Sequence, residues 1–260
     1  MKQIVDEYIQ KLNCKRKKVF IWFRDDDVSV NSEKLNTLIK YFLEKRTDIL
    51  MAVIPNSVEE ETIKVIRENN RLIVGQHGFC HINYSVGDEP KSEFPKSRPY
   101  ESALAELELG RKMIKKLFPE NYADVFVPPY FEIDDSILKR ISGWYKWFSC
   151  WWTNSINEDN CVFVNAQVDF VNWDTIKEYG GSRYVEEQVL RELTLLDELP
   201  YSATVIGVVL HHDYCETDSY QELDWFFSLP EQYKNVYIIS PKQAYDFVCS
   251  KKVLIYCRDY

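Results

Sequence analysis

All four histidines of this 260-residue chain lie in two short clusters, and each cluster directly follows an apolar, β-branched run. One cluster holds His77 and His81, and the other holds His211 and His212. A triplet of carboxylates, Asp25–Asp27, follows a third run of this kind. Imidazoles and carboxylates are the ligands and proton carriers of hydrolytic metal sites. Their position at the ends of predicted strands therefore indicates metal-assisted hydrolysis.

The first histidine pair has the spacing of two ligands on one face of a helix. His77 and His81 are four residues apart, so a helical turn would bring both rings to one side of a metal. This spacing is a weak signal alone, and the carboxylate triplet strengthens it. Two histidines, a carboxylate and an open position are the usual pattern of catalytic zinc.

The triplet Asp25–Asp27 needs a compensating charge, because adjacent like charges raise one another's pKa. A bound dication would supply that charge, and so would the neighbouring Arg24. An alternative interpretation is a cap on the following helix, although Ser29, Asn31 and Ser32 could cap it equally well.

The second histidine pair is a candidate general acid. A histidine titrates near working pH, and a neighbouring carboxylate such as Asp213 can hold it protonated. The alternative is a packed, hydrogen-bonded histidine at a strand end.

Short apolar runs alternate with amphipathic segments along the whole chain. This alternation predicts an α/β fold in which parallel strands are covered by helices, as a barrel or a doubly wound sheet. In such folds the functional groups gather at the carboxyl ends of the strands. We predict one domain over 1–260 and strands at 19–24, 49–54, 71–75, 124–127, 148–152, 161–170, 203–210 and 236–239.

Three local patterns refine this outline. Leucines, isoleucine and phenylalanine between 35 and 43, and a second set between 185 and 196, have helical spacing. Ser57 followed by Glu60 resembles a capping box at a helix start. The irregular stretch Asn83–Pro99 predicts a long loop beside the first histidine pair, a frequent place for an active-site lid.

Composition excludes several classes of protein. The net charge of −9, with no long basic run, argues against a nucleic-acid surface. No apolar run approaches the ~18 residues of a membrane span, and the charged N-terminus is unlike a signal peptide. Seven cysteines without a C-x-x-C pair favour reduced thiols and a cytoplasmic protein. Aromatic abundance alone places no subunit interface.

In this order, the clusters resemble the five motifs of the polysaccharide deacetylase (NodB-homology) superfamily of carbohydrate esterases. The first motif, T-F-D-D-G, matches Arg24 to Val28 best with Asp26 as the general base and Asp27 as the metal ligand. A slip of one residue would make Asp25 the base and Asp26 the ligand. The second motif, H-x-x-x-H, matches the ligands His77 and His81.

The remaining motifs follow along the chain. The third, R-P-P-Y, resembles Val127 to Tyr130, with Val127 in place of the arginine that orients the base. The fourth, D-x-x-x-W, matches Asp169 and Trp173. The fifth, L-x-H, matches Leu210 to His212, which makes His212 the acid and His211 its neighbour. The strings F-R-D-D-D, Q-H-G-F-x-H, K-S-E-F (Lys91–Phe94) and V-P-P also look like a divergent branch of the superfamily.

The resemblance implies a distorted (β/α)7-type barrel that hydrolyses an N-acetyl group on a sugar or glycan. The implied cofactor is a divalent metal, Zn²⁺ first, with Co²⁺, Mn²⁺, Ni²⁺ or Fe²⁺ as alternatives. We hypothesise that Arg24, on the same strand face as Asp26, replaces the missing arginine. The implied substrate-binding residues are Arg24, Pro129, Tyr130, Asp169 and Trp173.

Two other functions remain open at this point. The same site could remove an O-acetyl group or hydrolyse a C–N bond of a small amide or ureide. A catalytically decayed glycan-binding protein is the alternative from another class, supported by Val127.

Overall fold

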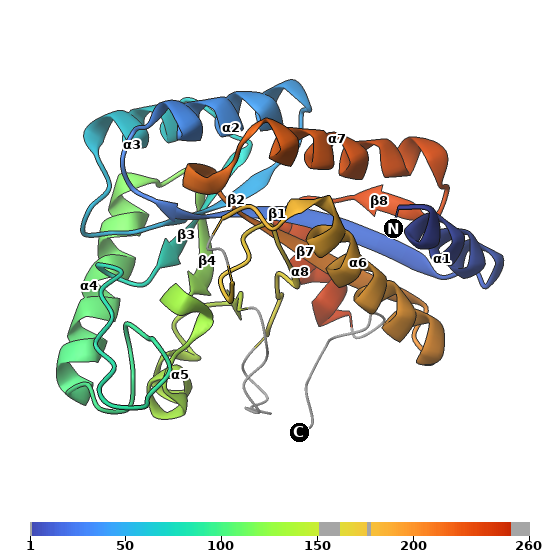
Figure 1. The fold of residues 1–260 in the computed structure, drawn as a ribbon. Coiled ribbons are helices and arrows are strands. Elements are labelled where there is room, and N and C mark those ends of the chain that lie inside the picture. Colours follow the sequence, from blue (N-terminus) through green and yellow to red (C-terminus); the bar gives the residue numbers. More distant parts are fainter. Residues whose placement is uncertain (1, 151–161, 176–177, 251–260) are drawn as a thin grey trace. The chain divides into compact units, whose positions relative to one another are not determined.

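A computed structural model describes residues 2–150, 162–175 and 178–250 (Figure 1). The described residues form two compact units. The terminal unit comprises the described residues of Met1–Arg24 and Ala166–Ile255, and the central unit those of Asp25–Asn165. Strand β1 (Lys18–Val28) belongs to both units. One domain over 1–260 stays a prediction.

The central unit is built on parallel strands joined by helices. Its strands neighbour one another in the order β5-β4-β3-β2, and the registered pairs are parallel. Every residue of β2 is buried, as expected of a parallel strand covered on both faces. The elements are α2 (Glu33–Glu44), β2 (Ile49–Val53), α3 (Glu60–Arg67), β3 (Leu72–His77), α4 (Tyr100–Leu117), β4 (Tyr122–Val127), η1 (Pro129–Phe131), α5 (Asp135–Ile141) and β5 (Trp147–Phe148).

The terminal unit repeats this alternation. Strand β1 pairs with β8, and β6 pairs with β7, both in parallel. Helices α1 and α6 are joined by an ion pair between Lys11 and Asp197 at 2.7 Å. The elements are α1 (Lys2–Cys14), β6 (Val168–Asp169), α6 (Gly181–Glu198), β7 (Ala203–His211), η2 (His212–Tyr214), α7 (Thr217–Gln232), β8 (Val236–Ile238) and α8 (Pro241–Cys249).

The predicted strands and helices are confirmed, with changed boundaries. Each predicted strand overlaps an observed one, although the ends of 148–152 and 161–170 fall outside the described residues. The largest difference is at β1, which continues through the aspartates to Val28. It can do so because the Ile54 N–H donates to the Val28 carbonyl at 3.0 Å. The triplet is thus part of a strand rather than a segment after it.

Helix starts differ from the prediction in one place. Ser32 caps α2 by accepting the Leu35 N–H at 3.0 Å. The predicted capping box of Ser57 and Glu60 is wrong, because α3 follows Glu59 and has no side-chain cap. Ser57 instead belongs to the turn after β2, where its N–H donates to the Ile54 carbonyl.

The predicted long loop is confirmed. Asn83–Pro99 contains no helix or strand, and its only bridge pairs Phe94 with Ile133. Ser92, Glu93 and Phe94 are buried within it. Among the described residues no helix has the length and apolarity to cross a membrane.

Candidate active site

A carboxylate and two imidazoles meet in the central unit. Oδ1 of Asp27 lies 3.0 Å from Nε2 of His77 and 3.0 Å from Nε2 of His81. His77 is almost fully buried, whereas His81 and Asp27 are partly exposed. Among the described residues, these three form one of two groups whose ligand atoms could hold a metal ion. The arrangement suits a buried ion with a solvent-facing side.

The backbone conformation that presents these ligands is irregular. Asp27 has φ 64° within β1, and His81 has φ 56°. His77 is the last residue of β3, and Gly78 after it has φ 57°. The expected helical turn between the histidines is therefore wrong, because left-handed residues reverse the chain there. The two ring centroids are 5.0 Å apart all the same.

A main-chain carbonyl orients His77. The oxygen of Val127 lies 3.0 Å from Nδ1 of His77. A carbonyl can only accept, so Nδ1 carries the hydrogen and Nε2 faces Asp27 with its lone pair. Val127 stands where the resembled motif has arginine, and its backbone still serves the site.

Electrostatics favour a positive charge at this place. Burial lowers the pKa of His77, but the hydrogen bond to Asp27 and the charges of Asp26 and Asp27 outweigh it, so the pKa is raised. Asp26 is itself buried. The structure thus brings Asp27 to the histidines and places Asp26 as a nearby charge.

Pro129 and Tyr130 support the turn that carries His81. The Tyr130 hydroxyl donates to the His81 carbonyl at 3.0 Å, and the two rings are 4.7 Å apart. Burial, together with the charges of Asp27 and Glu93, raises the pKa of Tyr130. Pro129 is buried, and its ring lies against Gly78. Both residues, predicted to bind substrate, make structural contacts with the second motif.

The second histidine cluster lies in the terminal unit. Nδ1 of His211 is 3.8 Å from Oδ1 of the buried Asp169. Asp169 also accepts the indole N–H of Trp173 at 3.0 Å, and the Trp173 ring meets His211 edge-on at 4.9 Å. His212 is buried, with Nε2 3.8 Å from Asp213. The structure therefore joins His211, the neighbour of the predicted acid, to the fourth motif.

Arg24 is fully buried in β1, two residues before Asp26. Alternate residues of a strand point to the same face, so Arg24 and Asp26 share one face of β1, as the hypothesised pairing of their charges requires. Sequence reasoning assigned no role to Glu93, which contacts the turn between the two metal-site histidines. Only the K-S-E-F string around it offered a signal.

Comparison with known proteins points to one fold. No protein-family model matches the chain, and no curated protein matches it in sequence. It is similar in structure to Puue allantoinase, with a TM-score of 0.64, 9% identity, and coverage of 89% of this chain and 90% of the other. It is also similar to a family 4 acetyl xylan esterase from Clostridium thermocellum in complex with a cobalt ion (TM-score 0.55, 12% identity, 90% and 97% covered). A third is peptidoglycan deacetylase PdaC from Bacillus subtilis (TM-score 0.54, 14% identity, 90% and 92% covered).

The chain has the polysaccharide deacetylase fold. The predicted distorted (β/α)7-type barrel is thereby confirmed. In parallel α/β folds, catalytic groups come from the carboxyl ends of strands. His77 ends β3, Val127 ends β4 and His211 ends β7, so this polysaccharide deacetylase fold carries its candidate residues where such chemistry is expected.

Proposed function

We propose that the chain is a metal-dependent hydrolase that removes the acetyl group from a nitrogen atom of a sugar or glycan. The observation that carries this proposal is the convergence of Asp27, His77 and His81, with the carboxylate oxygen 3.0 Å from both imidazole nitrogens. A cytoplasmic location, predicted from cysteine usage, is part of the same proposal.

The residues present fit a divalent cation. Nε2 of His77 and Oδ1 of Asp27 are both acceptors when the imidazole is neutral, and they face each other at 3.0 Å. Such a contact needs a positive species between the atoms, either a proton or a metal ion. Ligands with bonds of about 2.0–2.1 Å in a tetrahedron are roughly 3.3 Å apart, close to this separation. Zinc is the first choice for two imidazoles and a carboxylate, with Co²⁺, Mn²⁺, Ni²⁺ and Fe²⁺ as alternatives.

Each catalytic step is assigned to a side chain. When bound, a divalent cation supplies Lewis acidity, which polarises a carbonyl and acidifies water. Asp26 takes a proton from the water that adds to the acetyl carbon. As the C–N bond breaks, His212 returns a proton to the leaving amine, and acetate is the other product. The contact with Asp169 makes His211 the alternative acid.

Substrate contacts are assigned to aromatic and charged residues of the motifs. Trp173 is held by Asp169 and partly exposed, so one face of its indole can stack on a sugar ring. Tyr130 is also partly exposed beside His81. Pro129 supports Tyr130 in this proposal, and Arg24, two residues before Asp26 in β1, replaces the arginine missing from the third motif.

The test combines metal content with product release. Protein purified without chelator should contain about one divalent ion per chain and release acetate from N-acetylated oligosaccharides. His77→Ala should lose the ion, and Asp26→Asn should retain it while turnover falls about 100-fold or more. Asp88→Asn, which changes an exposed carboxylate of the long loop, is the matched control. The proposal fails if both chelated and metal-restored protein release no acetate from any N-acetylated fragment.

A second candidate substrate follows from the likeness to an allantoinase, which has the highest TM-score of the three structures. The same residues would then hydrolyse a C–N bond of a small amide or ureide. The likeness to an acetyl xylan esterase favours an O-acetyl ester as a further alternative. Measuring ammonia and acetate on matched substrates separates these reactions. A decayed glycan-binding protein, suggested by Val127, would bind oligosaccharide and release neither product.

A further inference from the structure

The turn between His77 and His81 is held by hydrogen bonds from several parts of the central unit. We define the histidine turn as residues 78–81. Its Gly78 N–H donates to the Val127 carbonyl, and the Gly78 carbonyl accepts from Gln76. The Phe79 carbonyl accepts from Asn56, and the His81 carbonyl accepts from Tyr130. The two N–H groups in the middle of the turn, those of Phe79 and Cys80, both donate to one side chain.

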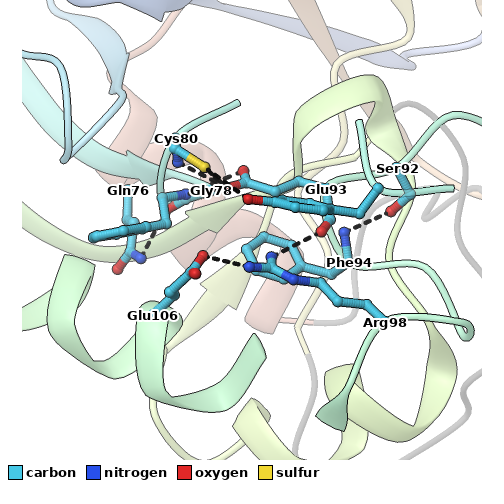
Figure 2. A network of polar contacts seen from close by, with 10 residues as sticks. Gln76, Gly78, Cys80, Ser92, Glu93, Phe94, Arg98 and Glu106 are labelled. Carbon is cyan, nitrogen blue, oxygen red and sulfur yellow. Dashed lines mark hydrogen bonds and ion pairs between the residues drawn. The ribbon is translucent and has the colours of Figure 1, made fainter. Parts of the chain in front are cut away.

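That side chain is Glu93, which is fully buried (Figure 2). Its carboxylate accepts the Phe79 N–H at 3.1 and 3.2 Å and the Cys80 N–H at 2.7 Å. The Cys80 thiol also donates to it at 3.2 Å. Hydrogen bonds to a carboxylate are shorter and stronger than neutral ones. One buried group thus fixes two consecutive peptide units directly before His81.

The main chain at Glu93 is itself held by hydrogen bonds. Its carbonyl accepts from Arg98 at 2.9 Å, and Arg98 also pairs with Glu106 of α4 at 2.5 Å. Ser92 beside it donates to the Glu132 carbonyl at 2.8 Å. These contacts, most of them drawn in Figure 2, tie the long loop to α4 and to the segment after η1. The backbone that carries the Glu93 side chain is therefore held in place by α4 and by the segment after η1.

Gly78 lets the carboxylate approach closely. A Cβ atom at Gly78 would lie 1.9 Å from Oε2 of Glu93 and 2.4 Å from Cγ of Pro129. The absence of a side chain there, together with φ 57°, allows the turn to sit between the two residues. Gly78 therefore allows Glu93 and Pro129 to pack directly against the histidine turn.

We propose that Glu93 is a positioning residue of the cation site. It touches neither the cation ligands' ring nitrogens nor the reacting atoms, and it acts by holding the backbone that aims His81 at Asp27. This inference rests on the proposed function, because it presumes that Asp27, His77 and His81 hold a cation.

A second metal site is the competing interpretation of the same residues. Ligand atoms of Cys80, Glu93 and Glu106 lie close enough together to hold an ion. However, Glu106 already pairs with the Arg98 guanidinium, whose positive charge would repel a cation. The Cys80 thiol already donates to the Glu93 carboxylate at 3.2 Å. The hydrogen bonds to the turn use the Glu93 oxygens instead.

The test measures Co²⁺ and Zn²⁺ binding to the full chain, by calorimetry and by the visible absorption of bound Co²⁺. Glu93→Gln keeps the shape but replaces one acceptor oxygen with a donor. We expect its cation affinity to fall about 10–100-fold, as for other groups that orient metal ligands, and the Co²⁺ spectrum to change. Glu89→Gln is the matched control, since Glu89 lies in the same loop and accepts hydrogen bonds from Val86 and Ser97 of that loop. It should bind like the unmodified chain.

The outcomes separate the two proposals. If the unmodified chain binds no cation, or His77→Ala binds as tightly, the proposed function fails. If the unmodified chain binds one cation and Glu93→Gln shows the same affinity and spectrum, only the positioning role is wrong. Two ions per chain, one of them lost with Glu93→Gln, would establish the second metal site. If Glu93→Gln does not fold, Glu93→Asp replaces it, and failure of both to fold would make Glu93 a folding residue and overturn the inference.

Discussion

At the scale of single residues, the backbone carbonyl of Val127 orients His77, one of the candidate metal ligands. It accepts from Nδ1 of His77 and so decides which nitrogen faces Asp27. The tautomer of a metal-binding histidine is commonly set in this way by the partner of its other nitrogen. The identity of residue 127 is consequently less important to the ligand set than the position of its carbonyl.

The raised pKa of His77 predicts how cation binding depends on pH. Only the neutral imidazole binds a metal ion, so protons compete with the ion once the pH falls to the pKa of His77, which lies above the ordinary histidine value of 6.5. Below it, affinity should fall about tenfold per pH unit. Asp26→Asn removes a charge that raises this pKa, so the loss should begin at lower pH. Calorimetry between about pH 5.5 and 8 checks this, and a midpoint that stays in place or rises contradicts it.

Alanine substitutions at Gly78 and Gly87 can separate the cost of backbone strain from the cost of steric clashes, because the two glycines have similar φ angles. Gly78→Ala should abolish cation binding and destabilise the fold by more than the roughly 1–2 kcal/mol of a left-handed alanine. Gly87 has φ 61° but nothing within 4 Å of its added Cβ, so Gly87→Ala should show the strain alone. Urea unfolding and Zn²⁺ titration of both variants give the comparison. Equal effects at the two positions would mean that the contacts of Gly78 are unimportant.

At the scale of elements, ionisable side chains are buried both at strand ends and along helix α6. The carboxyl ends of β3 and β7 present histidines, where a ligand can compensate their burial. Helix α6 instead buries Glu192 in its interior, with an exposed fraction of only 3%. Burial raises the pKa of Glu192 to about 7, although Arg191 opposes this. Ionisation of this glutamate is therefore unfavourable in the folded chain.

The Glu192 carboxyl should make the free energy of unfolding decrease as the pH rises. Between the ordinary glutamate pKa of 4.5 and about pH 7, the folded chain keeps the proton of Glu192 and the unfolded chain releases it. Stability is therefore highest below this window and decreases across it, by up to about 3 kcal/mol. Glu192→Gln should match the unmodified chain near pH 4.5 and exceed it at pH 8, as measured by urea unfolding. Glu187→Gln, on the exposed face of α6, should keep the original pH dependence. If Glu192→Gln keeps it too, Glu192 is not the cause.

At the scale of the whole molecule, the candidate chemistry is divided between two compact units. The candidate metal ligands and Glu93 belong to the central unit, whereas His211 and Asp169 belong to the terminal unit. A ligand that binds only the folded state stabilises the part of the chain it contacts. Cation binding should thus act on the two units unequally.

Hydrogen exchange tests this inequality. At a cation concentration 100-fold above Kd, the binding unit gains about 2.7 kcal/mol. Amides that exchange by local opening should be protected in 72–81 and 92–98, and much less in α8 of the terminal unit. His77→Ala should show no protection in either. Equal protection of both units would place the cation elsewhere or couple the units fully.

Pattern alone determined the reactive residue types and the elements around them. Apolar runs and helical spacing are local properties, so the eight strands and the helices α2 and α6 could be predicted from them. The clustering of histidines after strands likewise indicated the candidate metal ligands, because strand ends of parallel folds meet at one edge.

Tertiary structure alone decided which groups act on which. Asp27 and His77 are 50 residues apart in sequence, and Glu93 is 13 residues from Cys80. The choice of Asp27 over Asp26, the left-handed turn at Gly78 and the contact of Asp169 with His211 depend on φ angles and side-chain directions. These φ angles and side-chain directions are set by hydrogen bonds between segments distant in the chain. Local propensity cannot predict them, because it depends only on neighbouring residues.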